Sequence, residues 1–366
     1  MSHEFTSSEI RSWLTCRKKW WFRYHEKLGS KRQHSAMTFG TIVHIALEAY
    51  FLGRDWQEAI AKFVKVNGTP WDVDNEEGYQ LAMANAMVSQ YISNGAWEML
   101  NHTVVACEWK FSVPVKTPSG RRWGQYTFSG KIDMITKDKW GNVYLWDFKT
   151  GSKDLDLEWA KLDSQMENYL WGYSQSHKVP AFQVIYSQLR KPTIKPKRIP
   201  VRDDNGFKQV FDVDGARVWI KEPCMETVHV DDGTPVGKNH GVHVDGKPRQ
   251  MARPDSGEKL LTRPETPAEY EARLVADIKW RPHHYFKDAN IIKTAKELQK
   301  IQERLWAMAH EIGNGYICTA SSSCQFYGCQ YREICIQDSK AGRLANFKIV
   351  ERHEELREEE GEENDE

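Results

Sequence analysis

The sequence predicts an α/β fold, a mixed central sheet flanked by helices, and three patterns indicate it. Apolar and polar residues alternate from Val105 to Val113, as in a half-buried strand. The segments Tyr126 to Lys137 and Val143 to Lys149 flank a five-residue loop that contains a glycine, which predicts a hairpin. A helical segment from about Leu157 to Gln175 leads into the apolar strand Phe182 to Leu189. This strand, helix and strand together predict a right-handed crossover.

Further helices are predicted toward both ends of the chain. The capping box Thr6-Ser-Ser-Glu9 opens a helix over about Ser7 to Lys27, and apolar spacing predicts helices over Thr38 to Leu52 and Glu76 to Ile92. Two more capping boxes begin at Thr266 and Thr294. We therefore expect helical N- and C-terminal parts around the sheet.

Composition indicates the domain organisation. We expect a single domain over residues 1–350, with its core in residues 4–189 and 281–335 and a Gly-, Pro- and Asp-rich insertion at residues 190–265. Residues 351–366 carry ten acidic and two basic side chains, which predicts a disordered acidic tail. The whole chain has 51 basic and 51 acidic residues, so the part before the tail carries a net charge of +8. Such a charge is compatible with a polyanionic partner.

The sequence also bears on cellular location and redox state. No apolar run approaches the roughly 20 residues of a membrane-spanning helix, and the N-terminus lacks the apolar core of a secretory signal. We therefore expect a cytoplasmic protein without a membrane partner. An odd number of cysteines, seven, disfavours a disulfide framework in such a chain, and four of them between positions 318 and 335 suggest a metal site.

Three residues of the predicted hairpin point to metal-assisted chemistry. The period of two along a strand places Asp147 and Lys149 on one face. The five-residue loop pairs Lys137 with Val143, which sets Asp133 opposite Asp147. Facing carboxylates repel, and a divalent cation between them relieves the repulsion. Their oxygen atoms suit Mg²⁺ or Mn²⁺, and Lys149 can orient a water or stabilise a developing negative charge.

Taken alone, an Asp-x-Lys sequence is more often a solvated strand face, and a lone histidine is more often a core or capping residue. The surrounding motifs change this balance. The stretch SGKIDMITKDKWGNVYLWDFKTG resembles motifs II and III of the PD-(D/E)XK nuclease superfamily, with Asp133 as the first acid and Asp147-Phe-Lys149 as the D-x-K. Within that superfamily it is similar to the RecB-like branch, because Gly40-Thr-Ile-Val-His44 matches a G-x-x-x-H motif and Gln165-Met-Glu-Asn-Tyr169 matches a Q-x-x-x-Y motif.

The resemblance implies a restriction-endonuclease-like core and a metal-dependent deoxyribonuclease. It makes His44, Asp133, Asp147 and the backbone carbonyl of Phe148 the metal ligands, and Glu108 resembles a further acidic position of the family. The catalytic set that it implies is Asp133, Asp147, Lys149, Gln165 and Tyr169. An imidazole ligand favours Mn²⁺ over Mg²⁺.

The cysteines carry a second resemblance. Cys324, Cys329 and Cys335, with Cys16 of the first helix, resemble the iron–sulfur staple of nucleases related to AddB and of CRISPR-adaptation nucleases. This implies a [4Fe-4S] cluster held by four thiolates. The spacing in that group is commonly the shorter C-x2-C-x5-C, and a structural zinc site in which Cys318 replaces Cys16 is the alternative.

The resemblance, with the absence of a P-loop motif, implies a stand-alone exonuclease of the phage type that acts in a bacterial host cell. Its partners would be single-stranded DNA or DNA with free ends, and proteins of recombination or replication. The alternatives are a spacer-acquisition nuclease, a structure-specific endonuclease and a DNA-binding scaffold with an idle centre. Basic residues beside tryptophans suit unpaired bases, although aromatic residues at helical spacing more often belong to a core. These DNA-contact candidates are Arg17, Lys18, Trp20, Trp21, Arg121 and Arg122.

Overall fold

The computed structural model describes residues 3–31, 35–67, 77–94, 101–119, 121–154, 156–178, 181–201, 208–211, 217–220, 226–227, 240–242, 248–250, 259–319, 324, 329–337, 343 and 345–356. The chain divides into two compact units. The first comprises Met1–Thr193 with Glu271–Glu366, and the second comprises Ile194–Tyr270. The second unit overlaps the expected insertion at residues 190–265.

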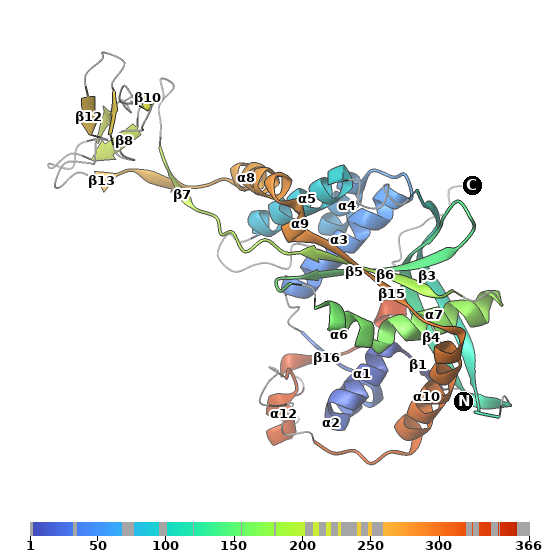
Figure 1. The fold of residues 1–366 in the computed structure, drawn as a ribbon. Coiled ribbons are helices and arrows are strands. Elements are labelled where there is room, and N and C mark those ends of the chain that lie inside the picture. Colours follow the sequence, from blue (N-terminus) through green and yellow to red (C-terminus); the bar gives the residue numbers. More distant parts are fainter. Residues whose placement is uncertain are drawn as a thin grey trace, which may run out of the picture. The chain divides into compact units, whose positions relative to one another are not determined.

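A mixed six-stranded sheet forms the centre of the first unit (Figure 1). Its strands run in the order β1-β4-β5-β6-β15, and β3 also pairs with β4. The pairs β1/β4 and β5/β6 are parallel and the others are antiparallel. The bounds are β1 (His3–Phe5), β3 (Thr103–Lys116), β4 (Arg122–Lys137), β5 (Val143–Gly151), β6 (Gln183–Arg190) and β15 (Phe286–Ile292). The predicted α/β class with a mixed sheet is confirmed.

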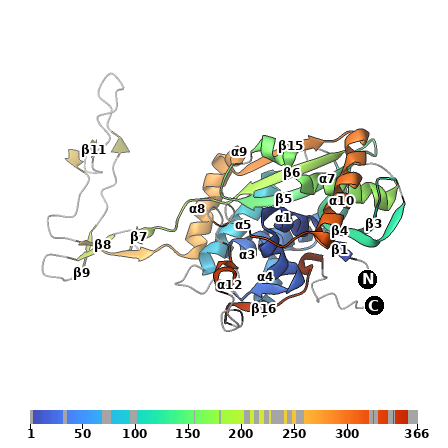
Figure 2. The same ribbon diagram turned by 90° about the horizontal axis from the view of Figure 1, so that it is seen from below.

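Helices cover both faces of this sheet (Figures 1 and 2). On one face lie α3 (Ser35–Phe51), α4 (Trp56–Asn67) and α5 (Glu77–Asn94). On the other lie α1 (Ser7–Thr15), α7 (Ser164–His177) and α10 (Ala295–Asn314). Phe148 of β5 packs against Phe51 and Tyr91 on the first face, whereas Phe111 of β3 packs against Tyr169 on the second. This packing on both faces of the sheet fixes the direction in which the side chains of β5 point. Strand β5 carries the predicted site residues Asp147 and Lys149.

Helix α7 approaches the sheet unusually closely. A Cβ atom on Gly172 of α7 would lie 2.2 Å from the ring of Phe111, and one on Gly130 of β4 would lie 2.7 Å from the same ring. Real Cβ atoms do not come so near other heavy atoms, so both positions need glycine for reasons of space. The absence of these two side chains brings α7, which carries Gln165 and Tyr169, directly onto the strands.

Two predicted helices are interrupted. The first ends at Cys16, whose backbone is extended (φ −166°, ψ 115°), and continues as α2 (Arg17–Trp20) and a π-helical turn, η1 (Trp21–His25). The continuous helix expected over Ser7 to Lys27 was therefore wrong. The second breaks at Asp163, between α6 (Leu157–Leu162) and α7. The Asp163 carboxylate accepts a hydrogen bond from the backbone N–H of Gln165 (2.9 Å), so it starts a new helix as an N-cap.

A β-bulge changes the pattern of strand β3. The register against β4 shifts between Val104 and Ala106, and Val105, which the alternation placed on the buried face, is 50% exposed. An extra residue in one strand reverses the side-chain alternation locally. The alternation predicted over Val105 to Val113 holds for Phe111 and Val113, which are buried, and fails at its start.

The second unit and the segment that follows it contain short elements. The second unit holds β7 (Arg198–Pro200), β8 (Lys208–Phe211), β9 (Arg217–Ile220), β10 (Glu226–Thr227), β11 (His240–Val242), β12 (Pro248–Gln250), β13 (Lys259–Leu260) and β14 (Thr262–Pro264). Helices α8 (Pro267–Trp280) and α9 (Pro282–Tyr285) precede β15. The capping boxes predicted at Thr266 and Thr294 are both present. Among the described residues, no helix is both long and apolar enough to cross a membrane.

The C-terminal segment folds back onto the N-terminal one. Strand β16 (Phe347–Ile349) pairs with β2 (Leu28–Ser30), and the Tyr331 hydroxyl, just before α12 (Arg332–Ile336), donates to the carbonyl of Leu28 (2.6 Å). The 3₁₀ turn η3 (Glu354–Leu356) follows. Residues 351–356 of the expected acidic tail thus belong to this folded segment, and residues 357–366 lie outside the described residues.

Glu9 is the centre of this contact between the two ends. Its side chain is fully buried, and it accepts hydrogen bonds from the Trp20 indole (2.9 Å) and the Arg352 guanidinium (2.6 Å). His353 lies 3.3 Å from its other oxygen. Burial alone would raise the pKa of Glu9, but the hydrogen bonds from His3 and Arg352 and the charges of Arg352 and His353 outweigh it and lower the pKa. The carboxylate is therefore held ionised inside the protein.

We expect Glu9→Gln to lower the free energy of unfolding by about 1–3 kcal/mol at pH 7, because Arg352 loses its charged acceptor. A carboxyl whose pKa is lowered by folding stabilises the fold above its unfolded pKa of about 4.3 and loses that contribution as the pH falls further. The difference between the two proteins in urea unfolding should therefore shrink below about pH 4. Glu354→Gln, in an exposed pair with Arg23, is the control and should change stability by less than about 1 kcal/mol. A difference that does not vary with pH would contradict the assignment.

Candidate active site

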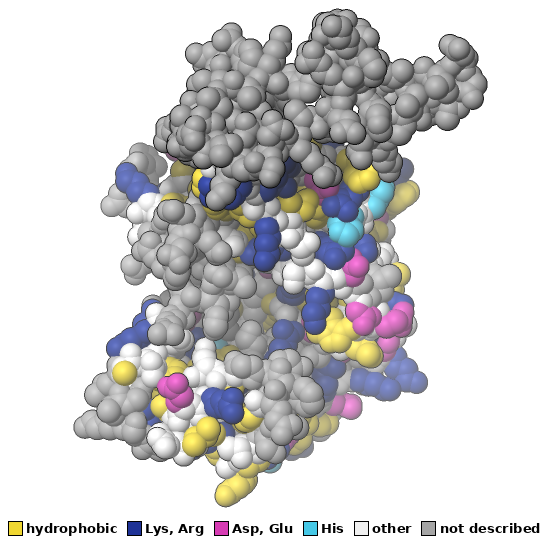
Figure 3. Space-filling view, turned by 90° about the vertical axis from the view of Figure 1, so that its left-hand side faces the viewer, with side chains coloured by type: hydrophobic (Ala, Val, Ile, Leu, Met, Phe, Trp, Pro, Cys, Tyr) yellow, Lys and Arg dark blue, Asp and Glu magenta, His cyan; other side chains and the backbone are white. Residues whose placement is uncertain are grey.

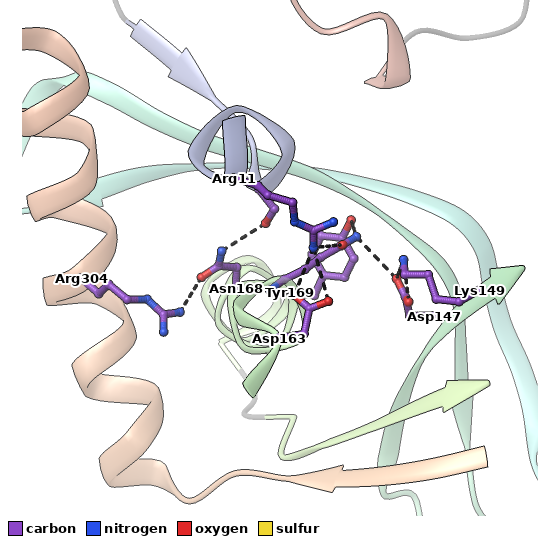
Figure 4. A network of polar contacts seen from close by, with 9 residues as sticks. Arg11, Asp147, Lys149, Asp163, Asn168, Tyr169 and Arg304 are labelled. Carbon is purple, nitrogen blue, oxygen red and sulfur yellow. Dashed lines mark hydrogen bonds and ion pairs between the residues drawn. The ribbon is translucent and has the colours of Figure 1, made fainter. Parts of the chain in front are cut away.

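The predicted Asp147 and Lys149 lie together on strand β5 and face helix α7 (Figure 4). Phe148 between them points to the other side of the sheet, against Phe51 and Tyr91. The hairpin register pairs Lys137 with Val143, as the loop length predicted. The faces assigned to this strand from its sequence are confirmed.

Asp133 reaches β5 through its side chain. The ladder between β4 and β5 includes the pair Met134 and Trp146. At the neighbouring position the Asp133 carboxylate accepts a hydrogen bond from the backbone N–H of Phe148 (2.7 Å). This bond holds Asp133 beside the strand of Asp147 and Lys149, although the predicted direct pairing of Asp133 with Asp147 is not part of the ladder.

Asp147 and Lys149 form a buried ion pair. The Lys149 ammonium lies 2.7 Å from both carboxylate oxygens, and the Asp147 side chain is 1% exposed. Burial raises the pKa of Asp147 to about 6, since it and the nearby Asp133 charge outweigh the attraction to Lys149. Burial would lower the pKa of Lys149, but the charges of Asp147 and Asp133 outweigh it and raise that pKa. The lysine is therefore cationic near neutral pH.

His44, Glu108 and Asp133 bring one potential ligand atom each within 4.8 Å of one another. His44 comes from α3, and its Nδ1 lies 3.7 Å from Oδ2 of Asp133. Glu108 has a left-handed backbone (φ 48°), which is uncommon for a residue with a side chain. An uncommon conformation held at a cluster of ligand-type atoms suggests function, since the surrounding structure must maintain it.

The charges of this cluster suit a divalent cation. Burial raises the pKa of Glu108 and of Asp133, and the Asp133 charge raises that of Glu108 further. Burial lowers the pKa of His44, so its imidazole is neutral and able to bind a metal. The Oδ2 atom of Asp147 is buried, and its partner is the Lys149 ammonium. Two carboxylates and an imidazole fit Mn²⁺ or Mg²⁺, and the ligand roles of Asp147 and of the Phe148 carbonyl stay predictions.

Gln165 and Tyr169 lie one turn apart on α7, on the side of the helix toward Asp147 (Figure 4 shows Tyr169). The Gln165 amide donates to the Tyr169 hydroxyl (2.7 Å) and, at 3.5 Å, to Oδ1 of Asp147. Arg11 of α1 donates to the other end of the Gln165 amide (3.3 Å). The structure thus brings all five predicted catalytic residues into one region and adds Arg11 to it.

The cysteines gather at the other end of the first helix. Burial raises the pKa of Cys335, and the neighbouring Cys324, Cys16 and Cys329 raise it further. Cys329 and Cys335 also pack against a small apolar cluster formed by Phe22, Leu28, Tyr331, Ile334 and Phe347. Cys318 is exposed. The four cysteines of the predicted cluster are therefore near one another, although Cys16 is more than three hundred residues from Cys324 in sequence.

The predicted DNA-contact residues differ in how far they are buried and in which side chains they contact. Trp20 is 5% exposed and donates to Glu9, so its role as a stacking platform was wrong, and a core role at helical spacing explains it. Arg17 is paired with Glu311 and lies over the ring of Trp13. Trp21 is half-buried and stacks on His25, and the ammonium of Lys18 lies over Phe22. Arg121 is exposed, and the side chain of Arg122 lies outside the described residues.

Cationic side chains are nevertheless common at the surface. On the face seen in Figure 3, Lys and Arg are spread over the described surface, and Asp and Glu are fewer. Such a distribution attracts polyanions without identifying a contact residue.

Sequence reasoning missed two residues of the site. Lys131 contacts Glu108 and lies two positions before Asp133, so the strand period that found Lys149 beside Asp147 would also have found it. Arg11 has no comparable signal, because its partners Asp163 and Gln165 are more than 150 residues away in sequence.

Comparison with known proteins gives one extensive match. A family model described as the PD-(D/E)XK nuclease superfamily matches residues 4–336. A search of curated proteins found no match. The crystal structure of SSO0001 is similar over 42% of this chain and 60% of its own, at 15% sequence identity and a TM-score of 0.19. The chain thus spans less than two thirds of that structure, and a likeness this weak carries no functional argument.

The raised pKa of Asp147 predicts that this residue destabilises the metal-free protein. A carboxyl whose pKa is raised by folding stabilises the fold below its unfolded pKa of about 3.9, and that contribution is lost as the pH rises through about 6. Replacing both members of the pair, Asp147→Asn with Lys149→Met, should therefore increase the free energy of unfolding by about 1–3 kcal/mol in EDTA at pH 8, because neither charge is then buried alone. Thermal unfolding with EDTA measures it. Lys149→Met alone is the matched control and should destabilise, because it leaves Asp147 buried and unpaired, so an equal loss in the double variant would contradict the prediction.

Proposed function

Because the chain belongs to the PD-(D/E)XK nuclease superfamily, we propose that it is a divalent-metal-dependent deoxyribonuclease that removes nucleotides from DNA ends. The single observation that carries the proposal is the convergence of His44, Glu108 and Asp133 beside the buried pair of Asp147 and Lys149. Such a set combines metal ligands with a fixed cation, and both can stabilise the negative charge that develops during phosphodiester hydrolysis.

The residues divide the work according to their charge. His44, Glu108 and Asp133 would hold Mg²⁺ or Mn²⁺, with Asp147 beside them, and the ion supplies positive charge next to the phosphodiester and activates a water. Lys149 stays protonated, because the charges of Asp147 and Asp133 raise its pKa against the effect of burial. We therefore assign it to stabilising negative charge on the phosphate rather than to accepting a proton. Gln165, which donates to both Asp147 and the Tyr169 hydroxyl, would orient Asp147 from the side of α7.

Preference for DNA ends is inferred from the RecB-like motifs and from the way that the chain ends meet. The β2/β16 ladder and the Glu9 contacts hold the N- and C-terminal segments together. We propose that this connection closes one side of a passage to the site, which would admit a threaded single strand more readily than an intact duplex. A structure-specific endonuclease would need an open groove instead.

A [4Fe-4S] cluster is proposed for Cys16, Cys324, Cys329 and Cys335. Cys16, Cys324 and Cys329 are the thiols that lie near enough to Cys335 to raise its pKa, and Cys318 is exposed. These positions support a site that includes Cys16 over the local zinc site that includes Cys318.

The activity is tested with end-labelled single-stranded and duplex DNA in Mg²⁺ and in Mn²⁺. We expect cleavage by the wild-type protein and a loss of about a hundredfold or more in Lys149→Met, because the cation next to the phosphate is gone. Lys139→Met, in the turn of the same hairpin, is the matched control and should cleave normally. Full activity of well-folded Lys149→Met would remove the assigned role.

The same assay separates the two modes of cleavage. Linear single strands should be degraded, whereas covalently closed circles of the same sequence should survive. Equal cutting of both substrates would establish an endonuclease and leave the catalytic chemistry standing. Binding without cleavage in either metal would favour the idle DNA-binding scaffold.

The cluster is tested by purification without oxygen, followed by iron and acid-labile sulfide analysis. We expect a brown protein that loses iron in Cys16→Ser and keeps it in Cys318→Ser. Loss of the cluster should also lower the melting temperature, because it removes a bridge that closes a very long loop. Stoichiometric zinc, lost in Cys318→Ser but not in Cys16→Ser, would identify the alternative site.

A further inference from the structure

Arg11 connects the first helix to the catalytic region (Figure 4). Its Nη2 atom lies 3.2 and 3.3 Å from the two carboxylate oxygens of Asp163, and 3.3 Å from Oε1 of Gln165. Asp163 is the N-cap of α7 and is buried. The guanidinium is thus bound at the start of the helix that carries Gln165 and Tyr169.

The contacts of Gln165 define the orientation of its side-chain amide. Its Nε2 atom faces Tyr169 and Asp147, at 2.7 and 3.5 Å, while its Oε1 atom faces Arg11. An arginine only donates hydrogen bonds and a carboxylate only accepts them. A flipped amide would therefore set its NH₂ group against the Arg11 cation and its oxygen against Asp147. One orientation satisfies both neighbours, and Arg11 supplies the donor that selects it.

We propose that Arg11 is a positioning residue for the nuclease reaction, acting through Gln165 to keep its NH₂ group on Asp147. The inference rests on the proposed function and deepens it. Arg11 acts on Asp147 indirectly, since Gln165 lies between the two side chains. It also gives the helix that ends at Cys16 a direct contact with the catalytic region.

Direct contact with a DNA phosphate is the alternative role for Arg11, and the experiment must distinguish it from positioning. Its side chain is 56% exposed, so the same guanidinium is able to contact a DNA phosphate. A phosphate contact would act mainly on KM and on the salt dependence of binding. A positioning role would act on kcat and would depend on the presence of Gln165.

A double-mutant cycle with Arg11→Met and Gln165→Ala distinguishes these roles. We expect Arg11→Met to lower kcat about tenfold with KM unchanged, and to have no further effect in the Gln165→Ala background. Arg11→Lys should recover part of the rate, and Lys300→Met, an exposed cation on α10, should behave like the wild type. Multiplicative losses in the double mutant, or a raised KM with a reduced salt slope, would overturn the proposal.

A measurement without turnover separates failure of this inference from failure of the proposed function. In protein labelled with ¹⁵N-glutamine, the Gln165 side-chain amide signal, identified by its loss in Gln165→Ala, should shift or broaden in Arg11→Met. An unmoved signal would overturn the inference whether or not the protein cleaves DNA. An inactive wild type with a shifted signal would instead contradict the nuclease assignment alone.

Discussion

The buried ion pair between Lys149 and Asp147 is the interaction around which the rest of the site is organised. Both groups are on one strand, at positions that a sheet necessarily turns to the same side. Burying them is costly, and the cost shows in the raised pKa of Asp147. The attraction between the two charges offsets only part of the cost of burial. The remaining cost is consistent with a site that binds a cation. Such a loss of stability is expected where a buried charge serves the proposed chemistry.

The sheet and its two helical layers hold the other groups around this pair. Helix α3 brings His44 from one face, and α7 brings Gln165 and Tyr169 from the other. Asp133 crosses between the strands through its bond to the Phe148 N–H, and the unusual backbone of Glu108 directs a further carboxylate to the same place. Each residue has a separate structural support, so the cluster persists in spite of the repulsion between its acids.

The N- and C-terminal segments meet at a second buried carboxylate, which like Asp147 is paired with a cationic side chain. Glu9 is a buried carboxylate that is kept ionised by Arg352 and by two histidines, and it joins strand β1 and helix α1 to the C-terminal segment. The cysteines lie at the far end of the same helix. Helix α1 therefore connects the closure of the chain, the cysteine group and, through Arg11, the catalytic region.

Periodicity and loop length in the sequence determined the sheet class, the faces of β5 and the hairpin register. These depend on local geometry, in which a strand alternates and a loop of known length sets the pairing. The further residues expected around Asp147 came from the resemblance of the sequence motifs to a nuclease family, and not from local geometry. Only the tertiary structure decided the helix breaks at Cys16 and Asp163, the bulge that exposes Val105, the burial of Trp20 and the contact of Arg11 with Gln165. Each of these depends on partners distant in sequence, and no local pattern records which segments will meet after the chain has folded.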